Sequence, residues 1–367
     1  MKGRVCYIVS DIYKSLSFEW IALRLKDQYE LSFILLNPGE SPIEQFLKDN
    51  SINVHRVAYE GKVDLLPATF RVYRLLRKLK PSVVHCHLLD AQLVGLSAAR
   101  MAGIKRRIYT RHNSNFHHAY HPRGVYYDRI SNFLSTRIIS ISQATDYTLH
   151  KLEQVRKDKI RKIPHGFDFS AFVNVSAHRI DDVRRRWSIP DNTIVIGVIA
   201  RHIEWKGIQY IIPAFKRIAE SYPDAILVLA NATGPYHQKI DDDVRGLRVI
   251  QIPFEEDVAA LYKTFSVYLH TPVDAIVEAF GQTYVEALAV GIPSVFTLSG
   301  IAPEFIRDGR NALVVNFKDS ASIFEAIQRL IPDEALRIHL IRNGIEDVLS
   351  HFGIDKMITQ LGHLYDE

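Results

Sequence analysis

Short runs of β-branched residues alternate with segments of helical length along most of this 367-residue chain. Strands that alternate with helices predict parallel sheets joined by crossover helices. Helix-length segments such as Phe18–Glu30 and Leu89–Ala102 separate the expected strands of a first series. These strands are Val5–Ser10, Leu31–Leu36, Val54–Ala58, Val83–His87, Ile108–His112, Ile138–Ile141 and Ile160–Pro164.

A polar stretch with few β-branched residues, Asp168–Asn192, interrupts this pattern and is the expected linker. The pattern restarts with Ile194–Ala200, Ile226–Ala230, Leu247–Ile252, Val267–His270, Ser294–Leu298 and Ala312–Val315, and a helical tail spans Ile323–Tyr365. The chain is also too long for one ordinary core. We therefore expect an α/β protein with two doubly wound, Rossmann-like domains, residues 1–172 and 173–350. For a helix in residues 351–367, a return to the first domain is one option.

Open parallel sheets bind ligands at the carboxyl ends of their strands, and two such sheets that face one another bind them in the cleft between. Residues that directly follow strands are therefore the candidates for a site.

Composition excludes several classes of protein. A hydrophobic fraction of 47% with 24% charged residues is typical of globular enzymes, not of disordered or collagenous chains. No apolar run approaches the roughly 18 residues of a spanning helix, and Asp11 interrupts the first apolar run too early for a signal peptide. We expect a cytoplasmic protein. Cys6 and Cys86 lie in expected strands, which favours buried side chains over redox or metal chemistry.

Positive charge is concentrated in the first half of the chain. Between Arg71 and Lys162 there are 19 Lys and Arg against 5 Asp and Glu, a local charge of +14, so the rest of the chain carries −9. Part of this excess belongs to ordinary solvated helix faces. The remainder predicts an anionic partner: a phospholipid surface, a lipid diphosphate, an acidic glycan or nucleic acid.

Several familiar nucleotide-binding and catalytic motifs are missing. No two glycines are separated by a single residue, which excludes the G-x-G-x-x-G fingerprint, and neither a P-loop nor a G-x-S-x-G elbow occurs. The triplet Asp241–Asp243 offers carboxylates for a divalent ion, but its polar surroundings favour a solvated surface. These absences disfavour oxidoreductases, P-loop kinases and serine hydrolases.

The stretch Glu278–Val295 reads EAFGQTYVEALAVGIPSV and carries two carboxylates eight residues apart, Glu278 and Glu286. It predicts a loop, then a helix from about Gly281 to Val290 that ends at a glycine. The amino end of such a helix favours a phosphate, whereas the carboxylates favour hydroxyl donors. A nucleotide sugar supplies both, since a diphosphate joins a ribose diol to a sugar.

Cations for that diphosphate follow the first strand of the second series. Arg201 and Lys206 lie just beyond this strand, and their planar fork and compact charge both suit phosphate oxygens. Either residue alone has the character of a surface cation. Together with the two glutamates they predict a nucleotide-sugar site.

These motifs resemble the family-4 retaining glycosyltransferases of the GT-B fold. The resemblance rests on Glu278–Val295, Ala200–Gly207 (ARHIEWKG) and Pro164–Asp168 (PHGFD). The weaker pieces Val84–Ala91, Thr110–His112 and Ser140–Ala144 extend it over nearly the whole chain. Three segments depart from the family pattern. Val9–Phe18 (VSDIYKSLSF) stands where the family has a glycine-rich loop, and His165-Gly166 stands where it has an Asn-Gly pair. A longer stretch that contains Asp274 replaces a serine before the first glutamate.

The resemblance implies transfer of a sugar, with retention of configuration, from a nucleotide diphosphate to an acceptor held by the first domain. It implies that Arg201 and Lys206 hold the diphosphate and Glu286 the ribose. Glu278, followed by the backbone of Ala279, Phe280, Gly281 and Gln282, holds the sugar, with His112 beside the reacting centre. We expect no metal, because the cations are side chains, and no further cofactor. The basic first half favours an anionic or lipid-linked glycan acceptor over nucleic acid, with peripheral contact at the inner face of the membrane as an option.

Other histidines leave alternatives open. His85 and His87 point to the same side of an expected strand, where a cleft role and a packing role are equally compatible with the alternation. His117, His118 and His121 offer metal ligands, but no Cys or carboxylate lies close in sequence, which favours a mobile loop over the acceptor cleft.

Two other functions fit parts of the sequence. A GT-B nucleotide-sugar epimerase would share the donor residues without needing a basic first domain. A non-enzymatic protein that binds nucleic acid or a membrane surface would use the basic half but leave Arg201, Lys206 and the two glutamates unexplained. The function predicted is a retaining, metal-independent glycosyltransferase of cell-envelope polysaccharide or glycolipid synthesis.

Overall fold

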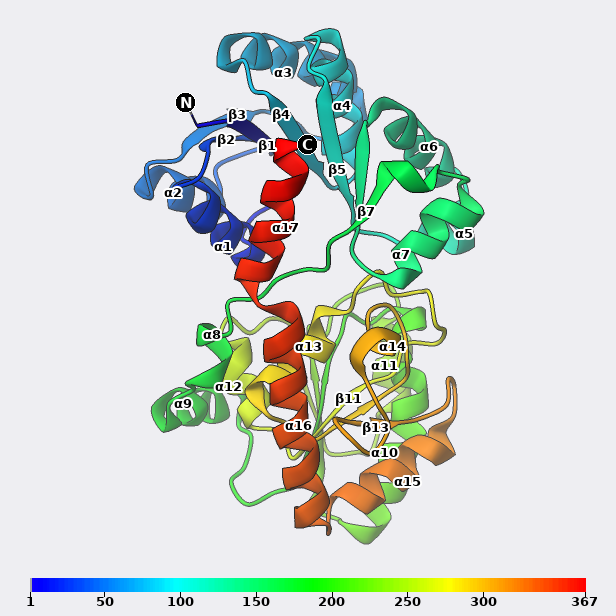
Figure 1. Cartoon of the computed structure of the whole chain (residues 1–367). Coiled ribbons are helices and arrows are strands. Elements are labelled where there is room, and N and C mark those ends of the chain that lie inside the picture. Colours follow the sequence, from blue (N-terminus) through cyan, green and yellow to red (C-terminus); the bar gives the residue numbers. More distant parts are fainter. Residues whose placement is uncertain (1) are drawn as a thin grey trace. The chain divides into compact units, whose positions relative to one another are not determined.

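The computed structural model describes residues 2–367 and divides into two units, each with its own parallel sheet (Figure 1). The first unit runs to Asp168 and also contains Phe352–Glu367, whereas the second is Phe169–His351.

The sheet of the first unit has seven strands in the order β3-β2-β1-β4-β5-β6-β7, and all neighbouring strands run parallel. Its strands are β1 (Arg4–Ser10), β2 (Glu30–Leu36), β3 (Asn53–Val57), β4 (Val83–His87), β5 (Arg106–Arg111), β6 (Arg137–Ser140) and β7 (Ile160–Lys162). Burial on both faces of the central strands explains why they read as nearly continuous apolar runs in the sequence.

Helices and short helical turns connect these strands. They are α1 (Leu16–Leu25), α2 (Pro42–Asp49), η1 (Lys62–Asp64), α3 (Leu65–Leu79), α4 (Leu89–Met101), α5 (Phe116–Tyr120), α6 (Gly124–Leu134), α7 (Gln143–Tyr147), η2 (Thr148–Leu152) and η3 (Lys157–Lys159). Ser15 caps α1 by accepting from the amide of Phe18, and Cys6 and Cys86 are both buried, as predicted. A Cβ at Gly95 would lie 2.7 Å from Cys86 Sγ, so α4 packs directly against β4.

The final helix, α17 (Ile354–Asp366), belongs to the first unit (red in Figure 1). It packs against α1, and its first turn is tied to the chain before it, where the Phe167 amide donates to Phe352 and the Ile354 amide to Phe167. Near its far end Tyr365 is buried, with its hydroxyl 2.5 Å from that of Tyr7. Residues far apart in sequence thus complete one core.

The second unit has six parallel strands in the order β10-β9-β8-β11-β12-β13. They are β8 (Val195–Ile199), β9 (Ile226–Ala230), β10 (Val249–Ile252), β11 (Val267–His270), β12 (Ser294–Phe296) and β13 (Leu313–Val314). Its helices are α8 (Ser170–Val173), α9 (Ala177–Trp187), η4 (Glu204–Lys206), α10 (Ile208–Ser221), α11 (His237–Asp243), α12 (Val258–Lys263), α13 (Gln282–Val290), α14 (Ala302–Phe305), α15 (Ser320–Leu330) and α16 (Glu334–Phe352).

The expected fold class and strands are confirmed, while several element ends differ from prediction. Strand β5 ends at Arg111, so His112 lies just beyond it, and α1 ends at Leu25, short of the predicted Glu30, where β2 begins. The polar stretch expected to be a linker forms α8 and α9, and the helical tail is three helices, of which α17 leaves the second unit. Across residues 2–367, no helix combines the length and apolarity needed to cross a bilayer.

Candidate active site

The segment after β8 brings a lysine to the end of a neighbouring strand. Strands β8 and β11 are neighbours in the sheet, and the turn η4 follows β8 closely. Gly207 ends this turn with φ +78°, and a Cβ there would lie only 1.9 Å from the Thr271 carbonyl oxygen. Only glycine permits this approach. The Val273 amide also donates to the Trp205 carbonyl, which holds Lys206 beside the loop that follows β11.

That loop carries Glu278 and leads into α13. Gly281 caps the helix with φ +83°. The loop is fixed from behind by a second glycine turn, where the Glu278 amide donates to Ser299 Oγ at 3.3 Å and the Ile301 amide donates to the Phe280 carbonyl. The predicted helix after Glu278 and its glycine end are therefore confirmed, and Ala279, Phe280, Gly281 and Gln282 form the turn at its amino end.

Lys206 and Glu278 form a buried ion pair, with 2.5 Å between Nζ and Oε1 and side chains only 16% and 8% exposed. His270, the last residue of β11, brings its Nε2 to 3.2 Å from the same oxygen. Burial alone would raise the pKa of Glu278, but the Lys206 charge and the His270 contact lower it to about 2. Glu278 is therefore ionised at neutral pH.

Glu286 lies in α13 in a different electrostatic setting. Its Oε2 accepts from the Tyr262 hydroxyl at 3.2 Å. Burial raises the pKa of Glu286 to about 7, and the Tyr262 bond only partly opposes this rise. Its charge thus depends on pH near neutrality. The two predicted glutamates differ because one has a cation beside it and the other has a phenol.

Arg201 lies two residues beyond β8, and its exposed side chain makes no ion pair within residues 2–367. The structure therefore brings Lys206 and Glu278 together, places Arg201 at the end of the same strand that leads to Lys206, and leaves Glu286 bonded to Tyr262. Sequence reasoning missed His270 and Tyr262. A polar residue that ends an apolar strand was the available sign for His270, whereas nothing in the sequence points to Tyr262.

The predicted residue His112 is half-buried and belongs to the first unit, in a cluster of histidines of which His85 and His87 are fully buried. Its Nε2 lies 3.0 Å from Nδ1 of His87, and its ring stacks on His165 with centroids 5.4 Å apart. Burial lowers the pKa of His112 to about 3 and that of His85 also to about 3. His85 bonds to Tyr365 and Thr110, at 2.6 and 2.8 Å. His85 and His87 are thus both buried and neutral.

The histidine-rich segment after His112 differs from its prediction as a mobile loop, because Phe116–Tyr120 form the short helix α5. His117 Nδ1 lies 2.6 Å from Asp128 and His118 Nε2 lies 3.3 Å from Glu153, so carboxylates absent from the local sequence approach in space. Within residues 2–367, no group of three or more metal-type side chains has the geometry of a metal site. The Asp241–Asp243 triplet lies in α11, where Lys239 pairs with Asp243.

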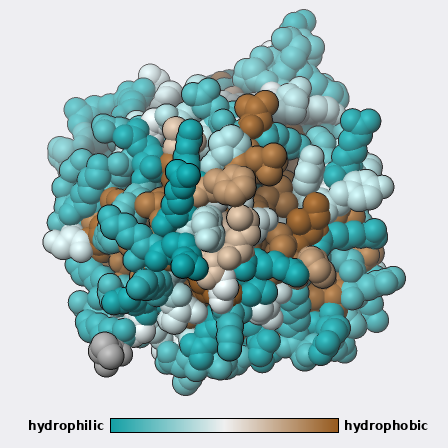
Figure 2. Space-filling model, turned by 90° about the horizontal axis from the view of Figure 1, so that it is seen from above, coloured by the Kyte–Doolittle hydropathy of each residue, from teal (hydrophilic) through white to brown (hydrophobic). Residues whose placement is uncertain are grey.

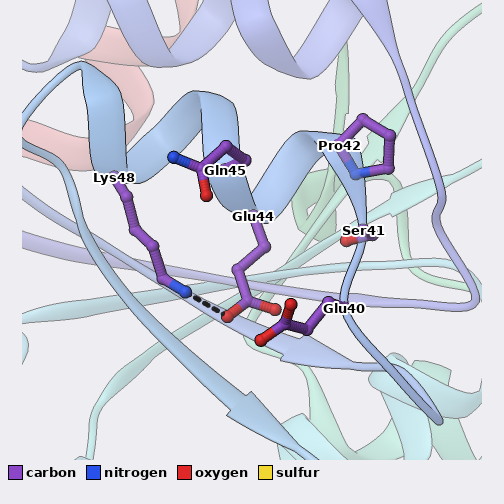
Figure 3. Close-up of a pocket in the computed structure, with 6 residues that line it drawn as sticks. All are labelled: Glu40, Ser41, Pro42, Glu44, Gln45 and Lys48. Atoms are coloured by element: carbon purple, nitrogen blue, oxygen red, sulfur yellow. Dashed lines mark hydrogen bonds and ion pairs between the residues drawn. The ribbon is translucent and has the colours of Figure 1, made fainter.

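A hollow of about 280 Å³ in the first unit does not suit an anionic ligand (Figure 3). It is lined by Glu40, Ser41, Pro42, Glu44, Gln45 and Lys48. Its lining cation, Lys48, is already bonded to Glu44 at 2.7 Å, as the dashed line in the figure marks. Arg56 pairs with both Glu40 and Glu44, at 3.5 and 3.3 Å, so among the described residues each cation at the hollow is already paired with a carboxylate and none is left for a diphosphate.

Comparison with known proteins agrees with this architecture. The Staphylococcus aureus capsular polysaccharide biosynthesis glycosyltransferase CapM is 24% identical over 358 residues, which are 88% of this chain and 92% of CapM. An Escherichia coli enzyme, named UDP-Gal:alpha-D-GlcNAc-diphosphoundecaprenol alpha-1,3-galactosyltransferase, is 21% identical over 363 residues, 95% of this chain and 92% of that one. The structure of Anabaena HepE with UDP and glucose superposes with a TM-score of 0.85 at 19% identity and covers 100% of both chains.

The two parallel-sheet units and this structural likeness define a GT-B fold. Two family models match the sequence, one described as Glycosyltransferase Family 4 over residues 21–171 and one as Glycosyl transferases group 1 over residues 179–347. The chain belongs to the group 1 and family 4 glycosyltransferases, which confirms the resemblance seen in its motifs.

Proposed function

We propose that this protein is a retaining glycosyltransferase that moves a sugar from a nucleotide-diphosphate sugar to a glycan or lipid-linked acceptor, without a metal. The observation that carries the proposal is the ion pair of Lys206 with Glu278 just before α13, the helix that also contains Glu286. A partly buried cation and a carboxylate held ionised follow the carboxyl ends of adjacent strands, where such sheets bind nucleotides, and a second carboxylate with a raised pKa lies in the helix that comes next.

In this proposal Arg201, Lys206 and the amino end of α13 bind the diphosphate. Glu286 accepts from the ribose diol. Glu278, with the backbone from Ala279 to Gln282, accepts from and donates to the sugar hydroxyls, and His112 keeps the role beside the reacting sugar that the family resemblance implies.

The mechanism follows from the charges that develop. The bond between the anomeric carbon and the leaving phosphate oxygen breaks, which builds positive charge on the sugar ring and negative charge on the diphosphate. Arg201 and Lys206 stabilise that negative charge in the transition state, and as side-chain cations they take the part that a metal ion plays elsewhere. The acceptor oxygen bonds to the same face of the sugar, and its proton passes to the leaving phosphate, which preserves the configuration.

Relatives support the choice of partners. The E. coli relative is named for a UDP-galactose donor and a diphosphoundecaprenol acceptor, CapM for capsular polysaccharide biosynthesis, and HepE was solved with UDP and glucose. An envelope polysaccharide or glycolipid is therefore the product class proposed here, in the cytoplasm at the inner face of the membrane.

The test is a thermal-shift panel of UDP, GDP, ADP and their sugars on wild type, Glu286→Ala and, as a control, Glu325→Ala, which alters an exposed carboxylate of the same unit. A ligand that binds only the folded state raises the melting temperature. We expect one nucleotide to stabilise wild type and the control but not Glu286→Ala. If no nucleotide stabilises wild type while polynucleotide binds in a salt-dependent manner, the non-enzymatic alternative is correct; interconversion of free nucleotide sugars would instead identify an epimerase.

A lipid-linked acceptor requires contact with a membrane, and one face of the first unit suits it. Figure 2 views the molecule from the side of α3 and shows brown apolar atoms gathered on this face among teal polar ones. Val63 is 88% exposed, Leu66 74% and Phe133 70%. We call this surface the α3–α6 face; its exposed apolar residues are Val63, Leu66, Phe70, Met101, Tyr126, Ile130 and Phe133.

Cations lie among these apolar side chains and join the helices of the α3–α6 face. Arg100 stacks on Phe133 with its guanidinium 4.9 Å from the ring centroid, and Lys62 lies 4.5 Å above the ring of Tyr127. A recess of about 510 Å³ at the end of α3 adds Arg77, Lys80 and Lys105. Apolar side chains surrounded by cations match an anionic bilayer, because the apolar groups enter the interface while the cations meet phosphates.

Cosedimentation with vesicles tests this contact. We expect wild type to bind vesicles that contain phosphatidylglycerol, to bind pure phosphatidylcholine weakly, and to dissociate in high salt. The double variant Leu66→Asp with Phe70→Asp abolishes binding, whereas Ile338→Asp, at an exposed apolar residue of α16, does not. Equal binding by both variants would show that the α3–α6 face is not the contact.

A further inference from the structure

Glu278 has two nitrogen partners on one oxygen, and only Lys206 is accounted for by the proposed function. Lys206 Nζ lies 2.5 Å from Oε1 of Glu278, and His270 Nε2 lies 3.2 Å from the same atom. His270 comes from β11 and Lys206 from the turn after β8, so two neighbouring strands converge on one carboxylate.

These two partners differ in freedom of movement. Lys206 is a long side chain on a short turn, and 16% of it remains exposed. The His270 ring is only 1% exposed and is held edge to face by Tyr284, with centroids 4.6 Å apart. Tyr284 is itself anchored, since its hydroxyl donates to the Thr297 carbonyl at 2.8 Å. Lys206 can leave Glu278 by rotation of its chain, whereas His270 cannot.

His270 is suited to be an uncharged partner of the Glu278 carboxylate. Burial lowers the pKa of His270 although Glu278 opposes this, so the ring is neutral near pH 7. A neutral ring that faces a carboxylate with Nε2 carries its hydrogen there, because a lone pair would be repelled. Within residues 2–367 neither ring nitrogen of His270 has the geometry of a hydrogen bond, and Nε2 makes a close contact of 3.2 Å with Oε1 of Glu278. His270 thus offers Glu278 one donor and no charge.

Donor binding creates a conflict at Glu278. The proposed function requires Lys206 for the diphosphate, yet Lys206 is paired with Glu278 in this structure. Removing the cation from a buried carboxylate is costly unless other donors replace it. A nucleotide sugar brings hydroxyls that donate to Glu278, whereas the bare nucleoside diphosphate takes Lys206 and returns nothing.

We propose that His270 is a positioning residue that keeps Glu278 oriented for the sugar while Lys206 moves from Glu278 to the diphosphate. This inference rests on the proposed function. It makes the exchange of partners a source of specificity: the site favours a nucleotide sugar over the nucleoside diphosphate that remains after transfer, which eases product release.

The experiment measures the dissociation constants of the nucleotide sugar and of its bare nucleoside diphosphate by calorimetry, for wild type and three variants. His270→Phe removes the donor but keeps an aromatic ring. His270→Gln restores an N–H at the reach of Nε2, and His270→Asn carries a similar amide that is too short. A hydrogen bond to a charged group of this kind corresponds to an effect of about 10- to 100-fold.

We expect His270→Phe and His270→Asn to weaken binding of the nucleotide sugar by that factor. Binding of the nucleoside diphosphate should change by less than about twofold, and His270→Gln should bind both ligands like wild type. Equal weakening of both ligands, or no weakening of either, would overturn the inference alone. If His270→Phe does not fold, the comparison of Gln with Asn decides. If the wild-type protein binds neither ligand, the proposed function is wrong, and this inference with it.

Discussion

A buried centre of opposite charges in each unit can be compared, and the two centres differ in access to solvent. In the first unit Arg111 lies 2.8 Å from Asp128 and 2.5 Å from Glu153, and all three side chains are at most 1% exposed. In the second unit Lys206 keeps 16% of its side chain exposed beside Glu278.

This difference in exposure distinguishes an ion pair that holds the fold from one that can bind a ligand. Arg111 makes several fixed contacts, including one to the Asn113 carbonyl at 2.9 Å, so its planar fork has no freedom to exchange partners. Lys206 holds a single carboxylate through a flexible chain and has a path to solvent. A closed ion pair fixes the loop after β5, whereas an open one is available to a ligand.

The largest effect is expected at the closed centre. Arg111→Leu leaves two buried carboxylates without their cation and should lower the free energy of unfolding by about 3–5 kcal/mol. Urea denaturation followed by circular dichroism measures this. Arg156→Leu removes an exposed partner of Asp158 and is the matched control, for which the midpoint should not change. A loss for Arg111→Leu no larger than the control would contradict the role of the closed centre.

At the open centre the effect should fall on activity. Lys206→Met keeps the length of the side chain but removes its charge, and transfer should slow by about 100- to 1,000-fold because the leaving diphosphate loses a cation. Initial rates with saturating acceptor measure this. Lys239→Met, which removes an exposed partner of Asp243, should leave the rate unchanged. Full activity in Lys206→Met would remove Lys206 from the proposed site.

The two glutamates should respond differently to pH. The pKa of Glu286 is raised to about 7, so ribose hydroxyls, which need an ionised acceptor, should bind more tightly as pH rises, by about tenfold per unit below 7. Because this folded-state pKa lies above the unfolded value, the stability contributed by protonated Glu286 is full at low pH and is lost as pH rises through 7. Glu278, with a pKa of about 2, should add no pH dependence to nucleotide affinity above about pH 4.

Nucleotide affinity measured by calorimetry from pH 5.5 to 8.5 tests this contrast. Glu286→Gln should weaken binding and abolish its pH dependence. A slope that persists in Glu286→Gln would mean that another group titrates.

The smallest effect concerns the neutral cluster of the first unit. Tyr365→Phe removes the hydroxyl that contacts Tyr7 and His85, and should lower the free energy of unfolding by about 1 kcal/mol. Tyr13→Phe, at a side chain that is 72% exposed, should leave stability unchanged. Equal denaturation midpoints for the two variants would show that the Tyr365 hydroxyl does not tie α17 to the sheet.

The strands were predictable because buried parallel strands require long apolar runs. The residues after them were predictable as site candidates because parallel sheets bind ligands at the carboxyl ends of their strands. Which side chains meet was not predictable, because sheet order is absent from periodicity: Lys206 and Glu278 are 72 positions apart and meet only because β8 pairs with β11. The carboxylates beside His117 and His118 were missed for this reason as well. These carboxylates are distant from the two histidines in sequence, and the fold brings them close.

The return of α17 to the first unit affects how the protein folds during synthesis. Tyr7 and His85 are made early, but the helix that covers them leaves the ribosome only after all of Phe169–His351. Domains usually fold in the order of their synthesis. Here the first unit must wait with an uncovered polar and aromatic surface while the second folds, so the nascent chain has a long interval in which chaperones can bind that surface.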